Sequence, residues 1–500
     1  MRQDQEFFAD GMLVEVLTTQ PVDRLFTYKA PIAGCFKGAI VLVPFGKRIV
    51  MGLVWGASTE KIEPKKIKTI HSILEYRPIQ PELQNFIRRV ADYTVSPLYS
   101  VFRLVTRVRD LAAQESHKRL IYKGKVPSSF KMTSARARVL ESFDQLDGTG
   151  LSISELAKLA KVSPSVINAM IPSGCLISKM QPKDLPYAAV DTTHSIRPLS
   201  EDQARVVSEL SKVLDQNAHS SILLCGVTGS GKTAVYLEAI AKVIDSGRQA
   251  LVLLPEIALT GEFTERLKAR FGVYPAEWHS GISQSERRRA WKMVGRGQAQ
   301  IVVGARSALF LPFESLGLIV VDEEHDSSYK QQDGVLYNAR DMAVLRASLA
   351  NAKVILASAT PSLETWNNAK SGKYKRFNLT KRYGSSVLPD IQIIDMRDEE
   401  LRSDQWISPT LKTKIDVAIN NSEQALLFLN RRGYAPVTLC RSCGERIGCD
   451  FCDTAMIEHR FQKRLMCHQC GETKAMPTSC PNCEVMGNFA PIGPGVERLA

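Results

Sequence analysis

Eight of the eleven cysteines in this chain form four pairs, each with two residues between its partners. The pairs are Cys440/Cys443, Cys449/Cys452, Cys467/Cys470 and Cys480/Cys483. Two intervening residues let both thiolates of a tight turn face one tetrahedral zinc ion, and two such turns complete a site with four cysteine ligands. Eight ligands therefore predict two structural zinc ions. The spacing leaves the grouping of the pairs open, although joining the first two would leave only residues 444–448 between them.

A second group of residues has the spacing of a nucleotide-phosphate loop. The apolar run 222–225 leads into Gly226-Val227-Thr228-Gly229-Ser230-Gly231-Lys232-Thr233, with a helix expected from Ala234. The glycines let backbone N–H groups wrap the phosphates at the N-terminus of that helix. Lys232 then reaches the β- and γ-phosphate oxygens, and the Thr233 hydroxyl ligates Mg²⁺. Because the chain has no Asn-Lys-x-Asp guanine signature, the expected nucleotide is ATP.

Acidic residues follow another apolar run, 318–321, in the order Asp322-Glu323-Glu324-His325. A carboxylate at the C-terminal end of a strand is where Mg²⁺ needs its second protein anchor, so Asp322 is expected to hold the ion through water. Glu323 is then placed to orient and deprotonate the attacking water. Alone, this cluster could be a solvated acidic loop. Beside the phosphate loop it indicates a hydrolytic site with Lys232, Asp322 and Glu323 as catalytic residues.

The elements that position these groups are apolar runs, each leading into a loop of charged or small polar residues. The runs are residues 222–225, 250–254, 301–303, 318–321 and 354–356. Continuous apolar strands with functional loops at their C-terminal ends predict an α/β fold, a parallel sheet covered by helices on both faces. A further apolar run, 425–429, predicts the first strand of a second α/β lobe.

Two smaller modules precede the sheet. Short apolar runs punctuated by proline and glycine over residues 12–55 predict an antiparallel β domain, followed by a helix around 81–93. Apolar residues at helical spacing over 153–160 and 166–171 flank a Ser-Pro-Ser turn and predict a winged helix-turn-helix. This module could enter a DNA groove or serve only as a helical support, and the sequence leaves both readings open.

The formal charge of +13 favours a polyanionic partner. The N-terminus lacks the apolar core of a signal peptide, and no run reaches the roughly 18 apolar residues of a membrane span. We therefore expect a cytoplasmic protein without a membrane partner. In that compartment, cysteines at this spacing bind zinc rather than form disulfides.

The order of the phosphate loop, the Asp-Glu-Glu-His segment and Ser358-Ala-Thr360 resembles a superfamily 2 helicase. The resemblance implies that His325, Ser358 and Thr360 couple the nucleotide state to nucleic-acid binding and that Gln203 reads the adenine. Three further segments resemble elements that contact a nucleic-acid strand without reading its sequence. They are residues 255–260, which include Thr260, residues 279–281, and residues 304–307, which include Arg306.

Aromatic and basic residues alternate in the loop after the acidic segment. They are Tyr329, Lys330, Tyr337 and Arg340. Aromatic rings interleaved with cations suit base stacking beside a groove that follows a nucleic-acid backbone, so these residues are expected to contact DNA. The alternative is that they are ordinary loop aromatics packed on the lobe.

The chain resembles the PriA (primosomal protein N′) family of replication-restart helicases in five features that occur in the same order. These are the phosphate loop, DEEHDSSYKQQ (322–332), SATPSLET (358–365), FLNRRGYAP (428–436) and the four cysteine pairs. The resemblance implies an ATP-dependent 3′–5′ DNA helicase that recognises stalled or repaired replication forks and initiates primosome assembly. The implied partners are forked and single-stranded DNA, primosome and helicase-loading proteins, and single-stranded DNA-binding protein, with the helicase a monomer at forks in the nucleoid.

The same resemblance assigns further residues. Phe26, Gly46 and Lys68 fall at positions that hold the 3′ end of a DNA strand, and Thr27 stands where the family commonly has an acidic residue. It also implies a nested arrangement of the zinc ligands. The outer site takes Cys440, Cys443, Cys480 and Cys483, and the inner site takes Cys449, Cys452, Cys467 and Cys470.

The expected architecture is a pair of RecA-like helicase lobes with an N-terminal β domain, a winged helix and a two-zinc ribbon insertion. The expected division is 1–110 for the DNA 3′-end-binding domain, 115–180 for the winged helix, 181–198 for a linker, 199–392 for helicase lobe 1, 393–437 for the start of lobe 2, 438–488 for the zinc region and 489–500 for the resumption of lobe 2.

The later motifs of lobe 2, including the arginine finger of the family, are not found before Ala500, so lobe 2 is expected to be truncated. An arginine finger commonly contributes about 10³–10⁵ in rate. We therefore expect weak nucleotide binding and poor unwinding from these residues alone. The alternatives are a fork-binding scaffold with little or no ATP turnover and an RNA-remodelling ATPase.

Overall fold

The computed structural model forms two compact units, Met1–Val387 and Leu388–Ala500. It describes residues 6–60, 62–108, 111–112, 117–143, 150–255, 261–382, 390–395, 399, 407–428, 437–451, 455–459, 464–467, 472–487 and 489–492. None of the helices within these ranges is both long enough and apolar enough to span a bilayer.

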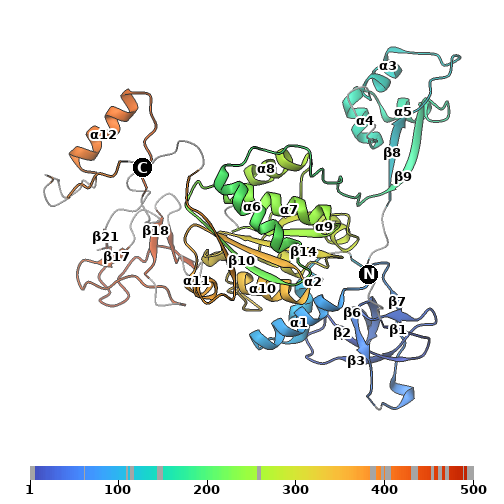
Figure 1. Ribbon diagram of the computed structural model, residues 1–500, viewed down its shortest axis with the longest axis horizontal. Helices are drawn as coiled ribbons and strands as arrows, with labels where there is room; N and C mark the ends of the chain where they lie inside the picture. Colours follow the sequence, from blue (N-terminus) through green and yellow to red (C-terminus); the bar gives the residue numbers. More distant parts are fainter. Residues whose placement is uncertain are drawn as a thin grey trace. The chain divides into compact units, whose positions relative to one another are not determined.

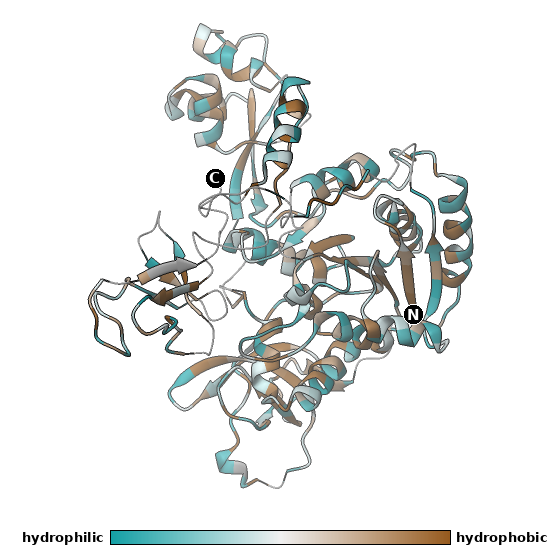
Figure 2. Ribbon diagram, turned by 90° about the vertical axis from the view of Figure 1, so that its left-hand side faces the viewer, coloured by the Kyte–Doolittle hydropathy of each residue, from teal (hydrophilic) through white to brown (hydrophobic). Residues whose placement is uncertain are grey.

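A seven-stranded parallel sheet organises the first unit, with strand order β12-β13-β11-β14-β15-β10-β16. The strands are β10 (Ser220–Gly226), β11 (Gln249–Leu253), β12 (Ala276–Trp278), β13 (Ile301–Gly304), β14 (Leu316–Asp322), β15 (Lys353–Ser358) and β16 (Lys375–Leu379). All five apolar runs of the middle segment lie in this sheet, which confirms the predicted α/β fold. In Figure 2 the central strands of the sheet are coloured mainly as hydrophobic, as their sequences require, whereas β16 (Lys375–Leu379) is mostly hydrophilic.

Helices cover both faces of the sheet, as Figure 1 shows for α6 and α7 on one side and α10 on the other. The helices are α6 (Glu201–Leu214), α7 (Lys232–Asp245), α8 (Gly261–Phe271), α9 (Gln284–Gly295), α10 (Ala339–Leu349) and α11 (Leu363–Lys370). Alternate residues of each strand enter different cores, because successive side chains point to opposite faces. Val252 packs with α6 and α7, whereas Leu251 and Leu253 enter the core that contains α10.

The N-terminal domain contains the predicted antiparallel sheet, in the order β3-β2-β6-β5-β7. Its strands are β2 (Leu13–Thr18), β3 (Phe26–Lys29), β5 (Ile40–Phe45), β6 (Arg48–Ala57) and β7 (Ser72–Ile73), with β1 (Phe7–Phe8) and β4 (Cys35–Phe36) forming a separate pair. The predicted helix is α1 (Pro81–Thr94), and α2 (Leu98–Val105) follows it.

The N-terminal domain and the helicase lobe share one hydrophobic core, which the sequence did not predict. Phe86 of α1 packs against Phe310, and the indole N–H of Trp291 on α9 donates to the carbonyl of Val105 at 2.8 Å. Arg346 of α10 is fully buried and its Nη2 lies 3.1 Å from Oε1 of Glu82 on α1. Removing one partner of a buried ion pair commonly costs about 3–5 kcal/mol because the other charge is left buried and unpaired, so Arg346 and Glu82 depend on each other across the two domains.

The helix-turn-helix prediction is confirmed in residues 117–182. A capping box at Ser152 and Glu155 begins α4 (Ile153–Ala160), and α5 (Pro164–Met170) follows after the turn. The remaining elements are α3 (Ser134–Glu141) and the antiparallel ribbon β8 (His117–Lys123) with β9 (Leu176–Pro182), which supplies the wing. The last residues of β9 therefore fall within the segment predicted as a linker.

The second unit contains α12 (Pro409–Asn420) and two small antiparallel sheets. One pairs β17 (Val437–Cys440) with β21 (Phe489–Ile492), and the other joins β18 (Ile457–His459), β19 (Arg464–Met466) and β20 (Thr473–Lys474). The strand predicted over 425–429 is wrong in its described part. Residues 425–428 have no regular secondary structure, and Leu426 and Phe428 are exposed, because no described strand lies beside them to pair with their backbone.

Candidate active site

The phosphate loop has the predicted strand–loop–helix setting between β10 and α7. Gly229 and Gly231 both adopt a φ of 79°, in the left-handed region that favours glycine. Gly231 is also required by space, since a Cβ there would lie 2.3 Å from Nε2 of Gln203. The Lys232 side chain is buried across the loop, and its Nζ donates to the carbonyl of Gly226 at 3.1 Å.

A hollow of about 610 Å³ opens beside this loop. Its lining includes Gln203, Lys232, Thr233, Asp322 and Glu323, which come from α6, α7 and the end of β14. The volume lies within the roughly 300–1,000 Å³ of sites that hold nucleotide-sized molecules. Every catalytic residue predicted from the sequence therefore faces one space.

Gln203 is held against the phosphate loop by both ends of its amide. Its Nε2 donates to the carbonyl of Ser230 at 2.9 Å, and its Oε1 accepts from the N–H of Ser200 at 3.0 Å. The side chain is buried at the base of the hollow. The capping box at the start of α6 therefore fixes the position of Gln203 beside the loop. The expected contact between Gln203 and the adenine base stays a prediction.

Asp322 ends β14 and is joined to α7 through Tyr236. The buried Tyr236 hydroxyl donates to Oδ2 of Asp322 at 2.9 Å, and the N–H of Glu323 donates to Oδ1 at 3.0 Å. Burial raises the pKa of Asp322 above its usual range, and the Tyr236 hydrogen bond opposes that rise. Glu323 has a φ of 45°, a left-handed conformation that costs a non-glycine residue about 1–3 kcal/mol and is concentrated at functional sites.

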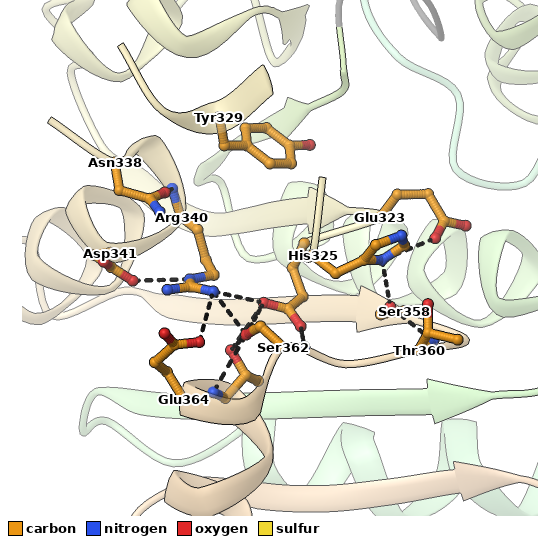
Figure 3. Close-up of polar contacts among 12 residues, drawn as sticks. Glu323, His325, Tyr329, Asn338, Arg340, Asp341, Ser358, Thr360, Ser362 and Glu364 are labelled. Atoms are coloured by element: carbon orange, nitrogen blue, oxygen red, sulfur yellow. Dashed lines mark hydrogen bonds and ion pairs between the residues drawn. The ribbon is translucent and has the colours of Figure 1, made fainter. Parts of the chain in front are cut away.

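The three predicted coupling residues lie together, as Figure 3 shows. Oγ of Ser358 lies 2.9 Å from Nδ1 of His325 and accepts from the N–H of Thr360 at 3.0 Å. Nδ1 of His325 is 3.6 Å from Oε2 of Glu323. A polar path therefore runs from the end of β15 to His325, and the Glu323 carboxylate lies near that ring but beyond hydrogen-bonding distance.

Glu324 was not assigned a role from the sequence, yet it is the most heavily bonded residue of the acidic segment. Its carboxylate is buried and accepts from the Ser362 N–H at 2.7 Å, the Ser362 hydroxyl at 3.0 Å and the Thr365 hydroxyl at 2.8 Å. Nη1 of Arg340 lies 3.5 Å away. The sequence did contain a signal for this role of Glu324. It closely follows a buried strand, and a carboxylate at such a position must find hydrogen-bonding partners.

The expected strand contact by Arg340 is wrong in this structure. Its side chain is buried, with Nη1 donating to the Ser362 hydroxyl at 2.6 Å and Nε to Asp341 at 2.8 Å. Glu324 and Glu364 also lie near the guanidinium, and Figure 3 shows Glu364 beside it. The surrounding carboxylates use the charge that a phosphate would need, so Arg340 ties the loop after the acidic segment to α11.

The expected base stacking by Tyr329 and Tyr337 is also wrong here. Both side chains are buried, and the Tyr329 hydroxyl oxygen lies 2.6 Å from the carbonyl of Asp322, to which it donates, and 3.0 Å from the carbonyl of Leu253. Tyr337 packs edge-on against Phe310, with the ring centres 5.4 Å apart. The alternative of loop aromatics packed on the lobe is the one observed, because the loop folds back over the core.

Other expected strand contacts remain predictions. Lys330 is exposed, and its carbonyl accepts from Nη1 of Arg306 at 2.8 Å. Thr260 lies outside the described residues.

The three residues expected at a DNA 3′ end lie close together in the N-terminal domain. Nζ of Lys68 donates to the carbonyl of Gly46 at 3.2 Å, and Phe26 packs edge-on against Phe45. Although Thr27 replaces the acidic residue of the family, its hydroxyl lies 3.0 Å from a carboxylate oxygen of Glu60. A negative charge is therefore present beside Thr27, supplied by the segment after β6.

The outer four cysteines converge in the second unit, and their sulfur atoms all lie within 4.8 Å of one another. The Cys440–Cys483 and Cys443–Cys480 sulfur pairs are 3.7 Å and 3.6 Å apart. Zinc with Zn–S bonds near 2.3 Å requires sulfurs about 3.8 Å apart, so the set fits a tetrahedral zinc site. Backbone N–H groups of Cys443 and Ser442 lower the pKa of Cys440, whereas burial and the neighbouring thiols raise the pKa of Cys483, so the four sulfurs retain protons that zinc binding would displace.

The structure thus brings together the four cysteines that the nested arrangement assigns to the outer site. Of the four cysteines assigned to the inner site, the structure describes Cys449 and Cys467. Cys467 belongs to a small hydrophobic core with Leu465, and Cys449 packs against that core. Cys452 and Cys470 lie outside the described residues.

Three family models match the chain. They are the DEAD/DEAH box helicase over residues 200–369, the 3′DNA-binding domain of PriA over 15–107, and the PriA DNA helicase Cys-rich region domain over 449–474. The fold and the site described above are those of a DEAD/DEAH box helicase domain joined to a zinc-ribbon region.

Curated relatives extend the similarity along the chain. The replication restart protein PriA of Rickettsia felis is 38% identical over 417 residues, covering 83% of this chain and 61% of the relative. That of Bacillus subtilis is 32% identical, covering 98% of this chain and 70% of the relative. The replication restart protein PriA of Haemophilus influenzae is 34% identical, and the match covers 97% of this chain and 68% of the relative. The chain belongs to the PriA family of replication restart proteins, and it spans 61% of the length of the Rickettsia felis relative.

The Tyr236–Asp322 hydrogen bond leads to a pH-dependent prediction. Mg²⁺ needs the Asp322 carboxylate, which protonates as the pH falls through its raised pKa. Tyr236→Phe removes a donor that favours the charged form, so this pKa rises further. As the pH is lowered, Mg²⁺-dependent binding of a fluorescent ATP analogue should weaken in both proteins. We expect this loss to begin at a higher pH in Tyr236→Phe than in the unmodified protein.

The matched control is Tyr93→Phe, which removes the hydroxyl of a tyrosine that is 70% exposed. Titration of the nucleotide phosphates is common to all three proteins and cancels in the comparison. Identical pH profiles for Tyr236→Phe and Tyr93→Phe would show that Asp322 does not anchor the metal.

Proposed function

We propose that this chain carries the motor of an ATP-dependent 3′–5′ DNA helicase that acts at stalled or repaired replication forks and initiates primosome assembly. The observation that carries the proposal is the single hollow into which the phosphate loop, Asp322 and Glu323 converge. Membership of the PriA family supports forked DNA as the substrate.

In the proposed reaction, Lys232 exchanges the Gly226 carbonyl for oxygens of the β- and γ-phosphates. Thr233 and Asp322 would hold Mg²⁺, which when bound would supply positive charge beside the phosphates. Glu323 orients a water molecule and accepts its proton as the water attacks the γ-phosphorus and the bond to the β-phosphate oxygen breaks. Gln203 contacts the adenine from the base of the hollow.

The state of the γ-phosphate would reach the DNA through the polar path described above. Glu323 is the residue that changes its environment on hydrolysis, and His325 links it to Ser358 and Thr360. Movement of this path would alter the loops at the same edge of the sheet, where Arg306 and Lys330 are proposed to touch the strand together with Thr260. A coupling of this kind typically changes a second affinity by about 5–150-fold.

The N-terminal domain would hold the 3′ end of a strand. Phe26, Gly46 and Lys68 supply an aromatic ring, an open backbone position and a cation for a terminal nucleotide. Glu60 stands where it could accept a hydrogen bond from a terminal hydroxyl, since its carboxylate lies beside Thr27. We propose that Glu60 thereby compensates for the missing acidic residue.

The second unit would hold two zinc ions, one on each of the nested cysteine sets. Zinc ribbons are small and exposed, so we propose that this region docks the primosome and helicase-loading proteins. Single-stranded DNA-binding protein is a further proposed partner. The protein would act as a monomer at forks in the cytoplasmic nucleoid.

Lys232→Ala tests the motor directly. We expect ATP hydrolysis that forked DNA stimulates, and we expect the substitution to lower the stimulated rate by about 10²–10³, the usual effect of removing one electrostatic contact to a developing charge. Phosphate release should be measured with forked DNA, single-stranded DNA and structured RNA. Lys212→Ala, an exposed lysine on α6, is the matched control.

Each outcome discriminates between functions. Equal stimulation by structured RNA would favour an RNA-remodelling ATPase. Fork binding that survives Lys232→Ala, with no measurable hydrolysis in either protein, would favour a scaffold. Hydrolysis that is indifferent to every nucleic acid would contradict a helicase.

The zinc assignment predicts two zinc ions for each chain, measured by atomic absorption. Replacing Cys440 and Cys443 with serine should leave about one zinc, and so should replacing Cys449 and Cys452, because each site needs all four thiolates. The controls are Cys35→Ser and Cys175→Ser, which change buried cysteines of the first unit. Each of these variants should retain two zinc ions. Replacing Cys440, Cys443, Cys480 and Cys483 together should also leave about one zinc, and loss of both ions in that variant would contradict the nested arrangement.

A further inference from the structure

The segment that follows the winged helix, which the sequence predicted as a linker, is bonded to the helicase lobe at several points. We call residues 184–199 the strap. It begins just after β9, which ends at Pro182. Its last three residues, Arg197, Pro198 and Leu199, line the hollow beside the phosphate loop. The strap therefore joins the end of the winged helix to one wall of the candidate nucleotide site.

The first contact of the strap is made by the buried carboxylate of Asp184. Nε and Nη2 of Arg288 donate to it at 3.0 and 3.1 Å, and Nζ of Lys292 lies 3.0 Å away. Burial alone would raise the pKa of Asp184, but Arg288 and Lys292 hold this pKa below its usual range, so the carboxylate stays charged. Detaching the strap here would leave both cations of α9 without their shared carboxylate.

The middle of the strap is held through its backbone and through its apolar side chains. Nε of Arg289 donates to the carbonyl of Leu185 at 2.7 Å, and its guanidinium lies 4.2 Å from the centre of the Tyr187 ring. The N–H of Val190 donates to Oε1 of Gln300 at 2.9 Å. Tyr187 and Val190 also pack against the two hydrophobic cores of the lobe, one against each.

Arg270 on α8 holds the strap close to the nucleotide hollow, which it also lines. Its Nε and Nη2 make a two-point contact with the carboxylate of Glu238 on α7, at 2.8 and 2.9 Å, and its Nη1 donates to the carbonyl of Thr192 at 2.7 Å. The Thr192 hydroxyl donates to Asp245, the last residue of α7, at 2.7 Å. The strap, α8 and the helix that begins at Lys232 therefore meet at one guanidinium.

We propose that Asp184 and Arg270 are positioning residues that keep the strap on the lobe, and that the strap in turn keeps residues 197–199 in place as a wall of the nucleotide hollow. The proposal rests on the proposed function for the identity of the nucleotide as ATP. It adds that attachment of the strap and occupancy of the hollow are coupled. A nucleotide that contacts residues 197–199 favours the attached strap, and by reciprocity the attached strap favours the nucleotide.

Asp184→Asn tests this coupling from a distance, because Asp184 is not among the described residues that line the hollow. The amide keeps the shape of the side chain but loses the charge that two cations share. We expect the dissociation constant of a fluorescent ATP analogue with Mg²⁺, measured on the full chain, to rise about fivefold or more, which is the lower range of couplings between sites. In hydrolysis stimulated by forked DNA, KM should rise while kcat stays unchanged, since the groups that carry the chemistry are intact.

The matched control is Asp215→Asn, which makes the same change at an exposed carboxylate at the end of α6. It should leave the dissociation constant and KM unchanged. Thermal unfolding checks that each variant is folded.

Two milder variants test the part of the strap nearest the hollow. Thr192→Val keeps the size of the side chain and removes only its bond to Asp245. Arg270→Lys keeps the charge but cannot make the two-point contact with Glu238 and reach the Thr192 carbonyl at once. Both should raise the dissociation constant of the ATP analogue, whereas Arg205→Lys, at an exposed arginine of α6, should not.

Cleavage by chymotrypsin after Tyr187 reports attachment of the strap itself, and the mass of the fragment that begins at Ala188 identifies it. The protease needs the strap to leave the lobe, because the Tyr187 ring is packed against Arg289 and the core. We expect the ATP analogue to slow this cleavage in the unmodified protein. Asp184→Asn and Thr192→Val should be cut faster and should gain less protection from the analogue.

The outcomes separate this proposal from the proposed function. If the analogue binds the unmodified protein without slowing cleavage after Tyr187, or if Asp184→Asn and Thr192→Val bind it as tightly as the controls do, the coupling is overturned and the proposed function stands. Protection of Tyr187 by the analogue, together with hydrolysis that no nucleic acid stimulates, would support the coupling and contradict the helicase. Failure of the unmodified protein to bind the analogue would overturn both proposals.

Discussion

The parallel register of β10, β15 and β14 is the constraint on which the site depends. Cys225 of β10 pairs with Ser358 of β15, and Ala357 pairs with Asp322 of β14, so three strands end at one edge of the sheet. That edge collects the phosphate loop, the carboxylates of Asp322 and Glu323 and the Ser358 hydroxyl, with Asp322 bonded to Tyr236 and Ser358 to His325. A shift of one residue between these strands would turn each side chain to the opposite face.

The features that the sequence predicted are those that depend on local spacing. The five apolar runs between residues 222 and 356 became strands, Gly226–Thr233 took the strand–loop–helix setting of a phosphate loop, and the outer cysteines met at distances that fit zinc. The features it missed depend on partners far along the chain. Tyr329 and Tyr337 look like exposed loop aromatics until the loop folds onto the core, and Arg340 finds its carboxylates on two different elements.

The packing between the N-terminal domain and the helicase lobe also depends on residues far apart in the chain, so local spacing did not predict it. It bears on how displacements pass between the two domains. Buried contacts such as Arg346 with Glu82 and Trp291 with Val105 make one core from two modules that the sequence presents as separate. Because a packed core transmits small displacements rather than absorbing them, a change at the sheet edge can reach the N-terminal domain.

The central claim is that the nucleotide state at Asp322 and Glu323 controls the affinity for DNA through Ser358. The most direct measurement is the dissociation constant for forked DNA with ADP and with a non-hydrolysable ATP analogue, in the unmodified protein and in Ser358→Ala. The account predicts that the two nucleotides give dissociation constants at least about fivefold apart, and that Ser358→Ala removes most of this difference while binding each nucleotide normally. Equal DNA affinities with the two nucleotides in the unmodified protein would contradict the claim.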